Sequence, residues 1–198
     1  MQEERQRNKR MREPIESVRT ERVMKKQEWP IYTADVSDGY KQALAGKYFK
    51  GRGQEMPFGN GTKSYALLVN PEQSDVTIIL NKIKTANFSN SPVRISTYLC
   101  ATARGELTRS SDIAPGNYTD CGKKTWRAEI YTGCNLRIIG GKNVMEDALK
   151  AFENNINNAK GSVLLPPGTM YIVELSSICP RETGYAVMSF FWWEMLCE

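Results

Sequence analysis

The sequence predicts a mainly β fold, a jelly-roll-like antiparallel β-sandwich of about eight strands with one amphipathic helix and an N-terminal arm. Short β runs separated by turn signals follow one another from Tyr65 to the C-terminus. In residues 93–99 and 126–131, apolar and polar side chains alternate, which is typical of strands with one buried and one solvated face. The predicted strands are 65–69, 75–85, 93–99, 126–131, 135–139, 162–165, 169–175 and 185–195.

Residues 1–30 are predicted to form a charged, extended and partly helical arm. They contain nine basic and six acidic side chains, and no aromatic one precedes Trp29. Such a segment cannot bury enough apolar surface to fold alone. We expect residues 1–14 to be flexible and residues 15–28 to be weakly helical. The arm is then either a solvated tail without a role or a segment that becomes ordered against a partner.

Residues 31–61 are predicted to form a turn-rich lead-in to a sandwich domain at 62–198. The lead-in holds six of the fifteen glycines, with Pro57 among them. The string 59–64 superficially suggests a phosphate loop, but the spacing of its glycines and lysine does not match one, and a strand follows where a helix would be required. Nucleotide binding is therefore not expected.

One amphipathic helix is predicted between Asn143 and Ile156. Asn143 is a suitable N-cap, and Glu146 stands three residues later. The apolar side chains on its expected face are Met145, Leu149, Phe152 and Ile156. This stripe would cover one end of the sandwich. Residues 101–124, polar and rich in Gly, Ser and Thr, are expected to form a long loop, and loops of that length often carry function.

The C-terminal strand carries large apolar side chains on both of its faces. Phe190 and Trp192 should project to one side, and Phe191 and Trp193 to the other. A strand in a two-layer sandwich has only one inner face, so the second set needs another cover. The protein's own helix or arm could supply that cover. The alternatives are a neighbouring subunit or, as the least favoured option, a stacked base or sugar.

The residue inventory argues against catalysis. The chain has no histidine, which removes the commonest general base and the usual metal ligand. The cysteines include no C-x-x-C pair, so a zinc ribbon or a thioredoxin-type site is not expected. Glu174 and Glu182 have no apparent third group beside them. We therefore expect no enzyme activity, no cofactor and no metal.

Five cysteines leave at least one thiol unpaired within the chain. They are Cys100, Cys121, Cys134, Cys179 and Cys197. They are either buried or free thiols, or some of them bridge neighbouring subunits in an oxidising setting. Cys197 is the candidate for such a bridge, because it lies one residue from the chain end.

The net charge of +5 is mild for 198 residues and does not by itself predict a nucleic-acid partner. No apolar stretch approaches the roughly 20 residues that span a bilayer, and the N-terminus is charged where a secretory signal would be apolar. A soluble protein without a classical signal peptide is expected. The sequons at Asn60, Asn87 and Asn117 would matter only in a secretory pathway.

Several turn and strand motifs between residues 46 and 175 resemble a little-characterised family of small β-sandwich proteins from spore-forming bacteria. The motifs are Gly46-Lys47-Tyr48-Phe49, Phe58-Gly59-Asn60-Gly61, Leu68-Val69-Asn70-Pro71, Asn87-Phe88-Ser89 before Pro92, and Leu164-Leu165-Pro166-Pro167-Gly168. The resemblance implies a structural protein of a spore or cell surface or of a virion-like particle, similar to jelly-roll subunits of spore appendages and phages. Those appendage subunits carry N-terminal cysteines, whereas this chain has none before Cys100.

The leading hypothesis is a structural subunit that self-assembles into a filament or particle through its arm and its sandwich. The predicted interface residues are Arg19, Arg22, Lys25, Lys26, Trp29, Phe190, Phe191, Trp192 and Trp193. Its partners would be copies of itself, with other surface or particle proteins as further candidates. The alternative is an adhesin-like binding module in which the 101–124 loop, Tyr98 and Tyr131 recognise a glycan or a protein surface. A capsid-like arm that touches nucleic acid is disfavoured, because six acidic arm residues would repel phosphate.

Overall fold

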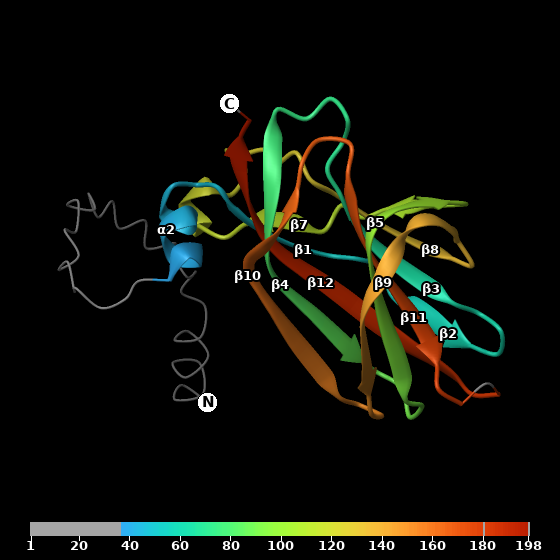
Figure 1. Cartoon of the computed structure of the whole chain (residues 1–198). Coiled ribbons are helices and arrows are strands. Elements are labelled where there is room, and N and C mark those ends of the chain that lie inside the picture. The colour runs from blue at the N-terminus through green and yellow to red at the C-terminus, as the bar shows by residue number, and fades with distance from the viewer. Residues whose placement is uncertain (1–36, 180, 198) are drawn as a thin grey trace, which may run out of the picture. The chain divides into compact units, whose positions relative to one another are not determined.

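Two antiparallel sheets of six strands each pack face to face (Figure 1). A computed structural model describes residues 37–179 and 181–197. The predicted fold class is confirmed, but the described residues form twelve strands, not about eight. The elements are α2 (Asp38–Leu44), β1 (Tyr48–Arg52), β2 (Met56–Gly59), β3 (Ser64–Val69), β4 (Val76–Asn87), β5 (Val93–Arg104), β6 (Thr108–Arg109), β7 (Ile113–Pro115), the 3₁₀ turn η1 (Tyr118–Asp120), β8 (Glu129–Cys134), β9 (Arg137–Leu149), β10 (Asn154–Leu165), β11 (Met170–Ser177) and β12 (Thr183–Leu196).

The strand order differs between the sheets. The first sheet runs β10-β4-β12-β1-β7, and β2 also pairs with β12. The second sheet runs β6-β8-β3-β11-β5-β9. Strands β1 and β2 come from residues 31–61, the predicted lead-in, and both pair with β12. This segment therefore contributes to the first sheet directly. Both sheets lie within one compact unit, Val36–Glu198.

The core fills the space between the two sheets. In β12 every second side chain points inward, and these residues are all fully buried: Ala186, Met188, Phe190 and Trp192. They meet inward residues of the second sheet such as Leu68, Ile130 and Val173. Phe49 of β1 lies beside Trp192, with 6.1 Å between ring centroids. Burial of such large side chains supplies about 1.5 to 3 kcal/mol each, so this layer dominates the stability of the fold.

The prediction of a helix at Asn143–Ile156 is wrong. This segment forms the second half of β9, a turn and the start of β10. Residues of β9 pair with β5 along most of its length, and residues 154–158 pair with β4. Met145 and Leu149 share one side of a strand as well as one face of a helix, so their spacing fits both structures. Phe152 lies in the turn with a φ of 55° and is 72% exposed. Asparagine is a poor helix former, and the four asparagines of 154–158 do not support a helix.

The only α-helix among the described residues is short and lies on the outer face of the first sheet. Ser37 caps α2, because its side chain accepts a hydrogen bond from the backbone N–H of Tyr40 at 3.4 Å. Ala43 of α2 packs against a small cluster made by Tyr48, Ile79 and Trp193. The helix therefore covers one end of a sheet face that would otherwise be exposed.

The C-terminal end of β5 and the N-terminal end of β9 pair to form a two-stranded ribbon. This ribbon contributes to a second apolar cluster, on the outer face of the second sheet. The cluster's buried members are Tyr65, Leu67, Ala101, Leu136 and Ile172. The ribbon changes direction where Cys100, Gly140 and Gly141 all have positive φ. A side chain at Gly141 would meet the carbonyl oxygen of Leu99 at 2.5 Å, so this bend requires glycine.

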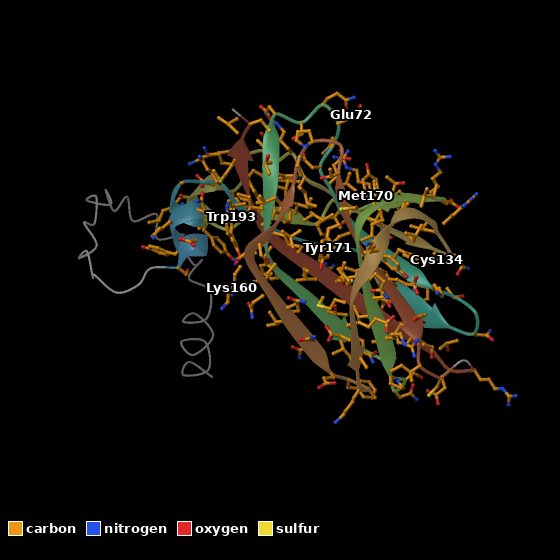
Figure 2. The ribbon with its side chains drawn as sticks, viewed as in Figure 1. Glu72, Cys134, Lys160, Met170, Tyr171 and Trp193 are labelled. Carbon is orange, nitrogen blue, oxygen red and sulfur yellow. The ribbon has the colours of Figure 1, made fainter. Side chains whose placement is uncertain are left out.

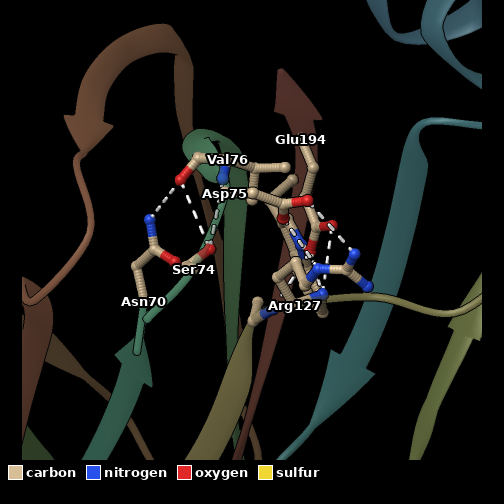
Figure 3. Close-up of polar contacts among 8 residues, drawn as sticks. Asn70, Ser74, Asp75, Val76, Arg127 and Glu194 are labelled. Carbon is tan, nitrogen blue, oxygen red and sulfur yellow. Dashed lines mark hydrogen bonds and ion pairs between the residues drawn. The ribbon is translucent and has the colours of Figure 1, made fainter. Parts of the chain in front are cut away.

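One buried carboxylate joins the two sheets at the end where β12 finishes (Figure 3). Glu194 of β12 accepts hydrogen bonds from the backbone N–H groups of Arg127 at 2.9 Å and Ala128 at 3.0 Å, and from the indole of Trp192 at 3.1 Å. The Arg127 side chain in turn pairs with Asp75, with 2.8 Å between Nε and Oδ1. That ion pair holds the pKa of Asp75 below its usual value. The segment that enters β8 of the second sheet is thus fixed to the first sheet.

We predict that Glu194→Ala lowers the free energy of unfolding by about 3 to 5 kcal/mol, because it leaves three N–H donors, two of them buried, without an acceptor. Glu194→Gln should cost only about 1 kcal/mol, because its amide oxygen can still accept those bonds. Urea denaturation measures both values. Glu182→Ala, at an exposed turn position, is the control and should change little. Equal losses for Glu194→Ala and Glu182→Ala would contradict the anchoring role.

Candidate functional site

The aromatic residues predicted for the assembly interface divide between the two faces of β12. Phe190 and Trp192 are fully buried in the core. Trp193 stacks on Tyr48, with 6.4 Å between ring centroids, next to α2 (Figure 2). Phe191 is half-buried on the outer face of the first sheet. The protein's own fold therefore covers three of these four rings, and only Phe191 remains accessible to a partner.

The other predicted interface residues are not among those that the structure describes. Arg19, Arg22, Lys25, Lys26 and Trp29 lie outside the described residues. Their proposed role in assembly stays a prediction.

The cysteines are free thiols, and four of the five are exposed. Cys197 follows the end of β12, with its sulfur 3.7 Å from Oγ1 of Thr77. The sulfur of Cys134, labelled in Figure 2, lies 3.4 Å from Oγ of Ser64. No disulfide joins cysteines within the described chain, so the expected bridge through Cys197 stays a prediction about contacts between subunits.

Two long edge strands lie together on one side of the sandwich, which we call the open side and define as β9 and β10. β9 is the edge of the second sheet and β10 is the edge of the first. They are joined by a turn, and Nδ2 of Asn157 lies 3.0 Å from the sulfur of Met145. No described strand pairs with the outer edge of either one. Their backbone N–H and C=O groups therefore form two rows that can accept a further strand.

β9 carries Arg137, Lys142, Glu146 and Asp147, whereas the first half of β10 has no side chain that would block such an addition. Residues 154–159 of β10 read Asn-Asn-Ile-Asn-Asn-Ala and include no charge and no proline. Natural edge strands usually carry lysine or proline to prevent pairing with other chains. Large apolar side chains are exposed on β9 and β10, namely Ile139, Val144, Ile156 and Leu164, and Phe152 is exposed in the turn between these strands. The uncharged, partly apolar segment 154–159 of β10 favours contact with another polypeptide.

The opposite edges of the two sheets are much shorter. β7 has three residues and β6 has two. The open side, with strands of 13 and 12 residues, is the main unpaired backbone surface of the described fold. Burial alternates with a period of two from Met145 to Leu149 and from Asn155 to Ala159, but the polarity of the side chains in the sequence does not. The helical spacing of the apolar residues was therefore the stronger signal in the sequence.

A buried carboxylate on the outer face of the second sheet is fully engaged by its neighbours. Glu174 of β11 accepts hydrogen bonds from Tyr65 at 3.0 Å and Tyr98 at 3.3 Å, and it pairs with Lys63 at 2.8 Å. Desolvation and the adjacent carboxylate raise the pKa of Tyr65. The hydrogen bond to Glu174 raises the pKa of Lys63. Lys63, Tyr65 and Tyr98 were not found from sequence as partners of Glu174. The one available signal was an acidic residue in an otherwise apolar strand.

The loop predicted at 101–124 is partly ordered into strands, because β5 extends to Arg104 and β6 and β7 lie within the segment. Tyr131 is half-buried, and its hydroxyl donates to Glu129 at 2.6 Å. Glu129 also pairs with Arg109 at 2.7 Å. Tyr98 and Tyr131, the two tyrosines predicted to bind a ligand, therefore both belong to polar networks on the surface of the second sheet. A ligand would have to compete with the hydrogen bonds of those networks.

Residues 37–179 and 181–197 contain no cluster of three or more Cys, Asp or Glu that could hold a metal ion. Within the same part of the chain, no helix is both long and apolar enough to cross a membrane.

We predict that the free energy of unfolding falls as the pH rises above 10.0, the ordinary tyrosine pKa. Burial raises the pKa of Tyr65 and Tyr171. The folded protein therefore keeps protons that the unfolded chain loses, and alkaline pH favours unfolding. Urea midpoints at pH values below and above 10.0 measure this loss. Tyr171→Phe should make the loss smaller, whereas Tyr118→Phe, at a residue that is 92% exposed, should leave it unchanged. An unchanged loss in Tyr171→Phe would contradict the assignment.

Comparison with known proteins places the chain in a family. No curated protein and no solved structure shows significant similarity to the chain. Residues 18–198, which include all the described strands, match the profile of a family of unknown function, DUF6143. The chain therefore belongs to the DUF6143 family.

Proposed function

We propose that this protein is a structural subunit that self-assembles through the open side of its sandwich. The observation that carries this proposal is the position of two long unpaired edges, β9 and β10, on one side of the fold. A second copy of the chain is the partner, because each copy presents the same two edges. Strand addition of this kind uses backbone hydrogen bonds for affinity and side chains for register.

The composition of the edge supports a partner of the same kind. Two copies of β10 can pair in antiparallel fashion about a two-fold axis, which places Asn154–Ala159 of one beside the same segment of the other. Since this segment has no charge, pairing brings no like charges together. Asparagine side chains stacked between neighbouring strands form further hydrogen bonds. Ile156, which is 50% exposed, would lose water-accessible apolar surface in the contact.

A two-fold contact alone closes a dimer, so a filament or particle needs a second interface. The N-terminal residues Arg19 to Trp29 are our candidates for it. These residues lie outside the described part of the chain. The family match assigns no function, and location on a spore or cell surface or in a particle is a further part of this proposal.

A binding module is the second candidate, and a groove of about 530 Å³ favours it. The groove is formed by residues 99–102 of β5 and by residues 162–170 at the end of β10 and in the following turn. Its lining is largely apolar and includes no aromatic ring, which suits a protein segment better than a glycan. A strictly monomeric protein in solution would favour this candidate over assembly.

We predict that the double substitution Ile156→Lys and Asn158→Lys abolishes the β10 contact, because lysines on an edge strand repel each other across a two-fold axis. Sedimentation velocity should then show a shift to monomers. The control Leu44→Lys with Gln73→Lys adds the same charge at exposed positions away from β9 and β10 and should leave assembly unchanged. Wild-type assembly in the β10 variant would contradict the proposed interface.

We predict a different result when residues 1–28 are removed. The sandwich should keep its thermal transition, because its strands and core lie within Val36–Glu198. Assemblies should fall back to the two-fold dimer, since the edge contact remains while the second interface is lost. Electron microscopy and sedimentation distinguish dimers from larger particles. Particles of wild-type size in the truncated protein would remove the arm from the assembly mechanism.

A further inference from the structure

Basic side chains surround the accessible ring of Phe191 on the outer face of the first sheet. On one level, β4, β12 and β1 place Lys82, Phe191 and Lys50 side by side. On the next level, the same strands place Lys84, Ser189 and Arg52 side by side. The spacing of strands places the Cα atoms of the two basic residues on each level about 10 Å apart, and it places the two levels about 7 Å apart. Four cations thus form a rectangle around Phe191 and Ser189.

Most of this charge is not neutralised by the described residues. Arg52 pairs with Asp112, with 2.9 Å between Nε and Oδ2. Lys50, Lys82 and Lys84 have no carboxylate within 4.0 Å among residues 37–179 and 181–197. The cations of β1 are at least 30 residues away in sequence from those of β4, so the modest net charge of the chain conceals a local positive surface.

A depression beside Phe191 gives this surface a defined shape. It has a volume of about 420 Å³, and its lining includes Lys50, Arg52, Ser189 and Phe191, together with Asp112, the carboxylate that pairs with Arg52. That volume lies within the range of small-molecule sites, about 300 to 1,000 Å³. A planar group could lie against Phe191 while anionic groups meet the surrounding cations.

Further aromatic rings follow on the same face along β12. Tyr185 points to the same side as Phe191, because the two lie six positions apart on one strand. Phe88 lies next to it, since its backbone N–H donates to the Tyr185 carbonyl at 3.0 Å. Tyr185 and Phe88 are 54% and 58% exposed. The distance from Phe191 to Tyr185 along the strand is about 20 Å, with Lys84 between these two levels.

We propose that this face, defined by Lys50, Lys82, Lys84, Phe191 and Tyr185, binds single-stranded nucleic acid along β12. Proteins that bind single strands without sequence preference combine a basic track for phosphates with aromatic rings on which bases stack. Both parts are present on one open sheet face. A duplex hides its bases from such rings. An anionic lipid surface offers headgroups to the lysines but no planar bases on which Phe191, Tyr185 and Phe88 could stack.

Fluorescence anisotropy of a labelled 12-nucleotide oligothymidylate with the full chain tests the proposal. We expect binding that weakens as salt rises, with a slope of log K on log[salt] of about −2 for three contacted phosphates. The triple variant Lys50→Ala, Lys82→Ala, Lys84→Ala should lose at least about tenfold in affinity and flatten the slope. Phe191→Leu keeps an apolar side chain but removes the stacking ring, and it should cost about fivefold or more.

The matched control is Lys123→Ala, Lys142→Ala, Lys150→Ala, which removes the same charge from exposed positions outside this face. It should bind like the wild type, and all variants should keep the wild-type thermal transition. Equal losses in both triple variants would overturn the proposal, because binding would then follow net charge alone. Equal affinity for a duplex of the same length, or binding to phosphatidylserine vesicles without binding to the oligonucleotide, would also overturn it.

Discussion

The fold depends on the packing and pairing of β12. This strand pairs with β4 on one side and with β1 and β2 on the other, so three other strands of the first sheet are positioned by it. Its inward side chains form a continuous apolar row that ends at Glu194. The burial of apolar side chains holds the two sheets together, but it does not favour one relative position of the sheets over another. The hydrogen bonds that Glu194 accepts from the backbone N–H groups of Arg127 and Ala128, just before β8, do fix that position. Loss of that carboxylate would therefore affect alignment as well as stability.

The period of two along β12 also determines what the protein shows to its surroundings. Because one set of alternate residues must fill the core, Tyr185, Ser189 and Phe191 are directed to the outer face. There α2 covers only the end around Trp193. The connectivity of the chain determines which strands lie at the sheet edges. β9 and β10 are consecutive in the chain but belong to different sheets, so they do not pair with each other, and each remains the edge strand of its own sheet.

Part of this arrangement could be predicted from sequence. Alternation in 93–99 correctly predicts β5, and the aromatic run of β12 correctly indicates that both its faces need cover. The segment from Asn143 to Ile156 was assigned the wrong structure, since apolar spacing alone cannot separate a helix from a strand-turn-strand unit. The partners of Glu174 and the cations around Phe191 come from strands distant in sequence. Only the strand order brings them together, and a single sequence does not specify that order.

The two proposed surfaces are connected by the geometry of the first sheet. β10 is the edge of this sheet, so antiparallel pairing of two β10 strands continues it from one copy into the next. A two-fold axis that relates antiparallel strands is perpendicular to the sheet, and the outer faces of both copies then point in the same direction. Lys82 and Lys84 lie on β4, directly beside β10, so the basic faces of two copies would flank the joint. A single strand of nucleic acid that reaches both faces would bind the pair more tightly than either copy, through the raised effective concentration of the second site. Assembly and anion binding would therefore strengthen each other without any change in the conformation of the sandwich.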